Sequence, residues 1–190
     1  MRLHLVRHGP THAKTMVGWT DLPADLSDTA AIARLSRYLP TSALLISSDL
    51  SRAITTADAL TAPLRQRLAH DADLREMHFG QWECRTFTDI EAEDPDRIRA
   101  FWETPGDVRP PGGESWNELT SRVADALERI AQLGTDTIVV CHFGAILAAL
   151  QTCLDLSPEM AFGHRIDNLS VTTLRREGGL WSEEIVNHRP

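Results

Sequence analysis

The sequence predicts an α/β fold: a three-layer sandwich with a mostly parallel central sheet and helices on both faces. Predicted strands and helices alternate along the 190 residues. The two clearest strands, residues 43–46 and 137–141, are continuous apolar runs without polar alternation. Such runs are typical of parallel strands that are covered on both faces. A chain of this length is expected to form one domain, residues 1–190, whose core needs no disulfide or metal.

Local apolar patterns justify each predicted element in the first half of the chain. Residues 3–6, Leu-His-Leu-Val, form a short β-type run before a Gly-Pro turn, which predicts a strand. Apolar residues recur at helical spacing in two later segments. In chain order, we expect a strand at 3–6, a helix at 29–39, a strand at 43–46, a helix at 51–60 and a weaker strand near 67–74.

The second half begins with a proline-rich stretch, residues 77–113, which indicates an insertion of short helices and loops. Ser115 and Glu118 have the spacing of a capping box and predict the start of a long helix. The expected elements are that helix to about residue 133, a strand at 137–141, an apolar helix at 144–154, and strands at 171–174 and 181–186 joined by a Gly-Gly turn.

Charge and cysteine content exclude several classes of protein. Nineteen basic and 27 acidic residues give a net charge of -8, which argues against nucleic acid or an anionic membrane as partner. Three cysteines without CxxC spacing predict reduced thiols. No opening stretch resembles a signal peptide, and the longest apolar run, 138–150, is too short to span a membrane. We expect a cytoplasmic protein; its oligomeric state stays open, with a homodimer one option.

Basic side chains follow three of the predicted strands, where the sheet of an α/β protein binds its ligands. Arg7 and His8 follow the first strand, Arg52 follows the second, and His142 follows the strand at 137–141. An isolated Arg-His pair is more often an ordinary surface feature. Two arginines and two histidines at one edge, however, require an anion, and a phosphoryl group is the natural candidate. The arginine beside His8 favours a neutral imidazole, the form that acts as a nucleophile.

Absent motifs narrow the alternatives. The sequence has no GxxxxGK[ST] phosphate loop, no GxGxxG after the first strand and no HExxH. His4, His8 and His12 are four residues apart, but they lie in a predicted strand and the turn that follows it, where this spacing makes no helical metal face. We therefore expect neither a metal site nor a cofactor.

Four segments in register resemble the histidine phosphatase superfamily, which has the phosphoglycerate mutase-like fold. They are Leu5–Thr11 with its Arg-His-Gly signature, Ser47–Ala53, Leu74–Glu83 and Val139–Gly144, and weaker similarity continues through Asn168–Ser170. The stretch Glu76–Glu83 is most similar to the α-ribazole phosphatase branch.

This resemblance implies a role for each matching residue. His8 would attack phosphorus, Arg7, Arg52 and His142 would hold the phosphoryl oxygens, and Glu76 would act as acid and then base, with Glu83 and Glu114 as the next candidates. Lys14 stands where relatives often have Asn, and its side chain is either a phosphate contact or a solvent-facing cation. The other candidates for phosphate or substrate binding are Gly9, Thr11, Thr20 and Phe143.

The function that we expect is metal-independent hydrolysis of a phosphomonoester through a phosphohistidine. The partner is a small phosphorylated metabolite, and the best candidate is α-ribazole 5′-phosphate of cobalamin biosynthesis. Alternatives are a phosphoglycerate mutase, a broad-specificity sugar or nucleotide phosphatase, and a non-catalytic module that binds a phosphorylated ligand. Trp82, Trp102 and Trp116 are expected either to line an aromatic substrate pocket or to belong to the core.

Overall fold

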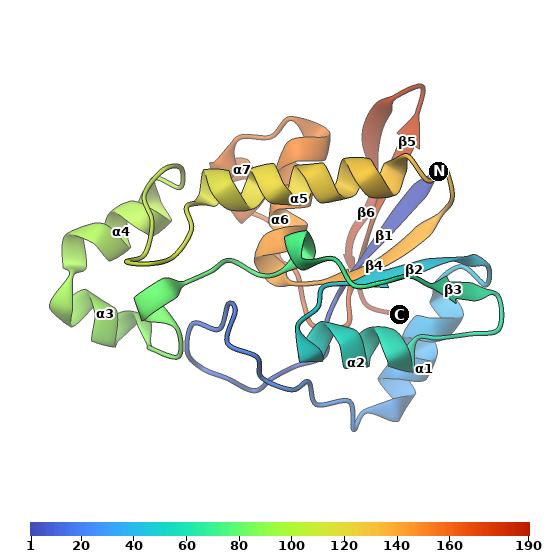
Figure 1. Ribbon diagram of the computed structural model, residues 1–190, viewed down its shortest axis with the longest axis horizontal. Helices are drawn as coiled ribbons and strands as arrows, with labels where there is room; N and C mark the ends of the chain where they lie inside the picture. The colour runs from blue at the N-terminus through green and yellow to red at the C-terminus, as the bar shows by residue number, and fades with distance from the viewer.

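A six-stranded sheet forms the centre of the computed structural model, which describes residues 1–190 (Figure 1). Its strand order is β3-β2-β4-β1-β5-β6. The first four strands in this order are parallel, β5 runs antiparallel to β1, and β6 runs antiparallel to β5 at the edge of the sheet. The strands are β1 (Arg2–Arg7), β2 (Ala43–Ser47), β3 (Arg65–Arg67), β4 (Thr137–Cys141), β5 (Val171–Glu177) and β6 (Leu180–His188). The predicted α/β sandwich is confirmed.

Helices cover both faces of the sheet, and Figure 1 shows α5 on one side of it and α1 and α2 on the other. The α-helices are α1 (Thr29–Tyr38), α2 (Ser51–Ala59), α3 (Phe87–Glu93), α4 (Pro95–Glu103), α5 (Trp116–Ala131), α6 (Phe143–Leu154) and α7 (Pro158–Phe162). Two short 3₁₀ helices, η1 (Ala72–Leu74) and η2 (Gly80–Trp82), precede α3.

The central strand β4 is apolar at successive positions because it lies between two layers of helices. Val139 and Cys141 pack into the core beneath α5 and α6. Ile138 and Val140 pack into the second core, beneath α1 and α2. Successive side chains of a strand point to opposite faces, so a strand between two helical layers needs apolar residues at every position.

The predicted capping box at the start of α5 is confirmed. The Ser115 hydroxyl accepts a hydrogen bond from the Glu118 amide at 3.2 Å, and the Glu118 carboxylate accepts one from the Ser115 amide at 2.8 Å. These two bonds satisfy amides that the first turn of a helix leaves without partners.

One predicted element was wrong, and one helix was not predicted. The strand expected near 67–74 is the shorter β3, because the Asp71 carboxylate accepts a bond from the Asp73 amide and turns the chain into η1. The sequence analysis also missed α7. Its signal is present in Ser157, whose hydroxyl caps the helix, and in Pro158 at the first helical position.

The insertion, residues 77–113, holds η2, α3 and α4, and Figure 1 shows α3 and α4 extending away from the sheet. Trp82 lies in the core, where its ring meets Phe101 edge to face at 5.4 Å between centroids. Trp102, on α4, is 36% exposed. The insertion therefore packs on the main core through Trp82, whereas Trp102 on α4 is partly exposed to solvent.

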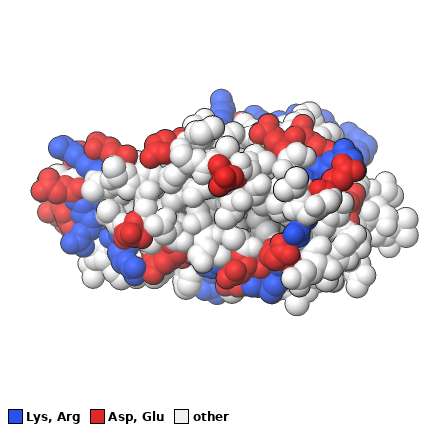
Figure 2. Space-filling view, turned by 90° about the horizontal axis from the view of Figure 1, so that it is seen from above, with Lys and Arg blue, Asp and Glu red and all other residues white.

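Acidic and basic side chains are interspersed on the face that Figure 2 shows, around a broad uncharged middle. This face carries no extended surface of a single sign. None of the helices combines the length and the hydropathy that crossing a bilayer requires.

Candidate active site

The parallel strands bring the predicted side chains together at one edge of the sheet. His8 directly follows β1, His142 directly follows β4, and Arg52 lies in the first turn of α2, after β2. The rings of His8 and His142 are 5.0 Å apart, centroid to centroid, and Arg52 Nε lies 3.3 Å from His142 Nδ1. The topology thus joins residues that are up to 134 positions apart in the sequence (His8 to His142).

His8 is buried, and one hydrogen bond fixes which ring nitrogen is free. Its Nδ1 lies 2.6 Å from the Gly9 carbonyl oxygen, which only accepts, so Nδ1 carries the proton. The other nitrogen, Nε2, then keeps its lone pair. Burial, reinforced by the charge of Arg52 and less by that of Arg7, lowers the pKa of His8 to about 3. The pKa of His8 is lowered, as the sequence predicts, but the main cause is burial and not the neighbouring arginine.

The backbone around His8 is held from two sides. The Asn168 side chain donates a hydrogen bond to the His8 carbonyl at 2.8 Å, and the Gly9 amide donates one to the Thr56 hydroxyl at 3.0 Å. Thr56 in turn donates to the Arg52 carbonyl, one turn earlier in α2. The sequence analysis missed Thr56, because a threonine inside a helix carries no signal of its own.

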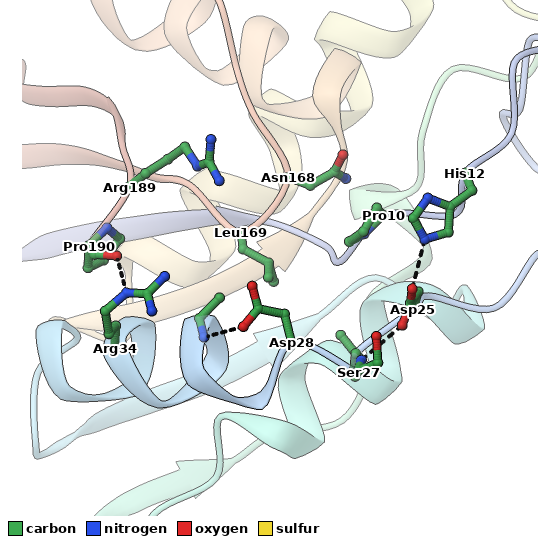
Figure 3. Close-up of a pocket in the computed structure, with 12 residues that line it drawn as sticks. Pro10, His12, Asp25, Ser27, Asp28, Arg34, Asn168, Leu169, Arg189 and Pro190 are labelled. Atoms are coloured by element: carbon green, nitrogen blue, oxygen red, sulfur yellow. Dashed lines mark hydrogen bonds and ion pairs between the residues drawn. The ribbon is translucent and has the colours of Figure 1, made fainter.

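A cavity of about 460 Å³ lies behind this loop and is shown in Figure 3. Pro10, Asn168 and Leu169 line it together with residues of α1 and the C-terminal segment. In the figure His12 turns toward Asp25, and their side chains are 2.8 Å apart. Neither His8, Arg52, Glu76 nor His142 lines this cavity. It borders the backbone that carries His8 without holding the reactive side chains.

Arg52 and His142 form one hydrogen-bonded unit. Arg52 is 1% exposed, and its two terminal nitrogens donate to the carbonyls of Gly18 at 2.6 Å and Thr20 at 3.0 Å. Its Nε donates to His142 Nδ1. Burial first, then electrostatic coupling to the His8 ring and the charges of the nearby arginines, holds the pKa of His142 well below its usual range. A neutral His142 whose Nδ1 accepts must carry its proton on Nε2, which is therefore a donor.

Two buried N–H groups at this edge, Nε2 of His142 and Nε of Arg7, have no protein acceptor, and the nearby Ser170 hydroxyl has no partner either. Arg7 donates from Nη1 to the Ile166 carbonyl at 2.6 Å, and its guanidinium lies 5.4 Å from the centre of the Phe143 ring. A buried donor without an acceptor is costly, and oxygens of an anion would satisfy both. The arrangement therefore fits a tetrahedral oxyanion.

Glu76 is buried beside the same groups, at the N-terminus of α6. Its carboxylate accepts hydrogen bonds from the Met77 amide at 2.9 Å and from the Gly144 amide at 3.0 and 3.1 Å. A side chain at position 144 would put its Cβ 2.3 Å from Glu76 Oε1, so only glycine permits this approach. Glu83 and Glu114, the other two candidate acids, are occupied elsewhere: Glu83 by backbone amides and Glu114 by Arg122.

The remaining candidates have different placements. Gly9 carries the carbonyl that fixes His8, and Phe143 lies under Arg7. Thr20 contacts Arg52 through its carbonyl and not through its hydroxyl. Lys14 is exposed, and neither it nor Thr11 makes a side-chain hydrogen bond to the other residues of the site.

Comparison with known proteins identifies the family of the chain. The model of the histidine phosphatase superfamily (branch 1) matches residues 3–189, and the chain belongs to that superfamily. Glucosyl-3-phosphoglycerate phosphatase of Mycolicibacterium vanbaalenii is 33% identical over 80% of this chain and 73% of that protein. Probable phosphoglycerate mutase GpmB of Escherichia coli is 28% identical over 95% of this chain and 87% of that protein.

Among solved structures, the α-ribazole phosphatase from Shigella flexneri superposes with a TM-score of 0.87 at 25% identity, over 100% of this chain and 97% of that one. The chain spans about half the length of the first curated relatives that it matches, three mycobacterial proteins of which it covers 51%. Family and fold are thus established, whereas these relatives differ in the substrates that their names give.

The environment of His8 generates a first prediction, which concerns its protonation. Because burial lowers its pKa to about 3, His8 is expected to stay neutral, with its proton on Nδ1, from pH 8 down to about pH 5. Long-range ¹⁵N NMR of the histidine rings checks both the tautomer and the titration. A His8 midpoint near the ordinary value of 6.5, or a proton on Nε2, contradicts the assignment.

Proposed function

We propose that this protein is a metal-independent phosphomonoester hydrolase that works through a phosphohistidine on His8. The observation that carries the proposal is the free Nε2 of a buried, neutral His8 beside two arginines and His142. A module that only binds a phosphorylated ligand needs the positive charge but no nucleophile. The whole chain, 1–190, would act as one catalytic domain with 77–113 as an insertion, in keeping with the family match over residues 3–189.

In the first half-reaction, the lone pair of His8 Nε2 forms the N–P bond as the bond from phosphorus to the ester oxygen breaks. Glu76 gives its proton to that oxygen, so an alcohol leaves. The His8 ring becomes positively charged, and its Nδ1–H bond to the Gly9 carbonyl stabilises this charge. In the second half-reaction, the Glu76 carboxylate takes a proton from water, the water oxygen attacks phosphorus, and the N–P bond breaks to release inorganic phosphate.

Arg7, Arg52 and His142 would hold the three non-bridging oxygens during both steps. The two donors without protein acceptors, on Arg7 and His142, would then gain partners. Fixed positive charge and N–H groups around phosphorus stabilise the negative charge of the transition state. These side chains supply the charge that a metal ion provides in other phosphatases.

The alcohol part of the substrate would lie in an aromatic pocket next to Glu76. This narrow pocket, of about 50 Å³, admits the edge of a ring or a few methyl groups. Glu76 is its one charged residue, and its other lining residues are Met77, Phe79, Phe101, Trp102, Trp116, Phe143, Gly144 and Phe162. Such a wall suits an apolar or aromatic alcohol. Within the proposal, the best candidate remains α-ribazole 5′-phosphate, whose base is an aromatic benzimidazole.

The same pocket argues against a phosphoglycerate substrate. The carboxylate of a phosphoglycerate needs a cationic partner, and the residues that line this pocket include no arginine or lysine. Arg7, which lies over Phe143, would already hold the phosphoryl oxygens. A mutase, as the name of the Escherichia coli relative gives it, must also return the phosphoryl group to such a molecule. Phosphate release compared with transfer from a bisphosphoglycerate distinguishes the two activities.

A second prediction tests the nucleophile. His8→Ala is expected to remove essentially all turnover while the fold survives, because Nε2 is the only group that bonds to phosphorus. Wild-type enzyme that is quenched during turnover of a ³²P-labelled ester should carry acid-labile, alkali-stable phosphate on His8. Label on a serine or cysteine would refute the mechanism, and absence of any turnover would favour a binding module.

A third prediction tests Glu76 as the acid. Glu76→Gln keeps the size of the side chain but cannot donate a carboxylic proton, so single-turnover phosphorylation by an alkyl phosphate should slow by about 10²–10⁴-fold. The loss with p-nitrophenyl phosphate should be much smaller, because p-nitrophenolate leaves without a proton. Equal losses on both esters would mean that Glu76 positions the phosphate instead.

A fourth prediction tests the aromatic pocket. Trp102→Ala should lower kcat/KM for α-ribazole 5′-phosphate by about 2- to 10-fold relative to glycerol 3-phosphate, the loss expected for one aromatic contact. The matched control is Phe87→Ala, because Phe87 is also an exposed aromatic of the insertion but lies outside the pocket. If Trp102→Ala affects both esters equally, the pocket does not bind the alcohol.

A further inference from the structure

Glu83 directly follows η2, and its carboxylate is surrounded by backbone amides. Its two carboxylate oxygens accept from the amides of Gly18 at 3.0 Å, Trp19 at 2.8 Å and Thr20 at 3.2 Å, and from Phe79 at 3.2 Å. Partial burial tends to raise the pKa of Glu83, but the bonds from Gly18, Trp19 and Thr20 outweigh it and lower the pKa. The carboxylate therefore fixes three successive amides of one loop segment.

The carbonyls of that same segment hold Arg52. Gly18 and Thr20, whose amides donate to Glu83, accept through their carbonyls from the two terminal nitrogens of Arg52 at 2.6 and 3.0 Å. The remaining nitrogen of Arg52, Nε, donates to His142 Nδ1. No carboxylate is hydrogen-bonded to Arg52, so the orientation of segment 18–20 determines where its guanidinium lies.

Trp19, the middle residue of the segment, contacts the stretch that carries Glu76. Its indole N–H donates to the Glu76 carbonyl at 2.8 Å. Its ring lies 4.5 Å from the Arg75 guanidinium and 4.5 Å from the His78 ring, so the residues on both sides of the acid contact it. Segment 18–20 thus touches the phosphate-holding arginine on one side and the backbone of the acid on the other.

The approach between the segment and residues 76–83 leaves no free space. A Cβ at position 18 would lie 1.9 Å from the Met77 carbonyl oxygen and 2.6 Å from Glu83 Oε1. Gly18 is therefore required for the carboxylate to reach the three amides. A displacement of Glu83 would leave the amides of all three residues without this acceptor.

We propose that Glu83 is a positioning residue that acts through segment 18–20 on both Arg52 and Glu76. It holds the acceptors that aim the Arg52 guanidinium at the phosphoryl group, and through Trp19 it fixes the backbone of the acid. The proposal rests on the proposed function for its kinetic consequences but not for its effect on anion binding. The positioning role requires a carboxylate at residue 83, because each of its oxygens accepts hydrogen bonds from two backbone amides. The side-chain nitrogen of a glutamine would place a donor where two amides also donate.

The test is Glu83→Gln, which keeps the shape and exchanges one acceptor for a donor. Binding of inorganic phosphate, measured by calorimetry, should weaken by about 10- to 100-fold, the loss typical when a residue that orients a binding group is changed. The matched control is Glu118→Gln, which alters a helix-capping carboxylate outside the site and should leave phosphate binding and turnover unchanged. Unchanged phosphate binding by folded Glu83→Gln would overturn the proposal.

A second variant keeps the proposal falsifiable if Glu83→Gln does not fold. Trp19→Phe removes the indole N–H but keeps a ring between Arg75 and His78, on a side chain that is 37% exposed. Single-turnover phosphorylation by an alkyl phosphate should slow by about 2- to 10-fold, the effect of one hydrogen bond, and phosphorylation by p-nitrophenyl phosphate should change less. Equal rates of wild type and variant on the alkyl ester would overturn the connection to Glu76. Lack of turnover in the wild type, with phosphate binding still weakened by Glu83→Gln, would refute the hydrolase and leave the positioning role standing.

Discussion

The burial of Arg52 without a paired carboxylate is the constraint on which the rest of the site depends. Moving a guanidinium out of water costs several kcal/mol unless its N–H groups find acceptors. Here the acceptors are two carbonyls and a ring nitrogen of His142, all neutral. No hydrogen-bonded carboxylate cancels the charge of Arg52, and the nearby carboxylates of Glu76, Asp21 and Glu83 act on it only through space. A site of this kind attracts an anion and keeps neighbouring imidazoles from taking up protons.

The two histidines follow from this constraint. Burial and the uncancelled charge lower the pKa of His8 to about 3, and the pKa of His142 falls well below its usual range for the same reasons. The unfolded chain has no such environment, so it binds these protons near pH 6.5 while the folded chain does not. Folding stability is therefore complete above that pH and decreases as the pH falls toward 3. The environment that keeps His8 unprotonated at neutral pH therefore lowers the free energy of unfolding in acid.

The sequence predicts the parts of the site that belong to regular structure. His8 and His142 come directly after apolar strands, so the parallel topology alone brings them to one edge. Glu76 lies between two short 3₁₀ helices, where no periodicity applies, and only the resemblance to a family identified it. Glu83 and Thr56 act through backbone amides and carbonyls, whose positions depend on the folded loop. The strand expected near 67–74 was wrong for a similar reason, because a side-chain cap at Asp71 overrode an apolar pattern.

The location of the aromatic pocket separates two functions along the chain. The groups that would hold the phosphoryl group come from the ends of strands and from α2, whereas two residues of the pocket, Phe101 and Trp102, come from α4, in a segment that extends away from the sheet (Figure 1). Within the proposed function, substitutions in α4 would alter one wall of the pocket, and α4 makes no hydrogen bond to His8 or Arg52. If this pocket binds the alcohol, selectivity could diverge in evolution through changes in α4 while the groups around phosphorus are preserved.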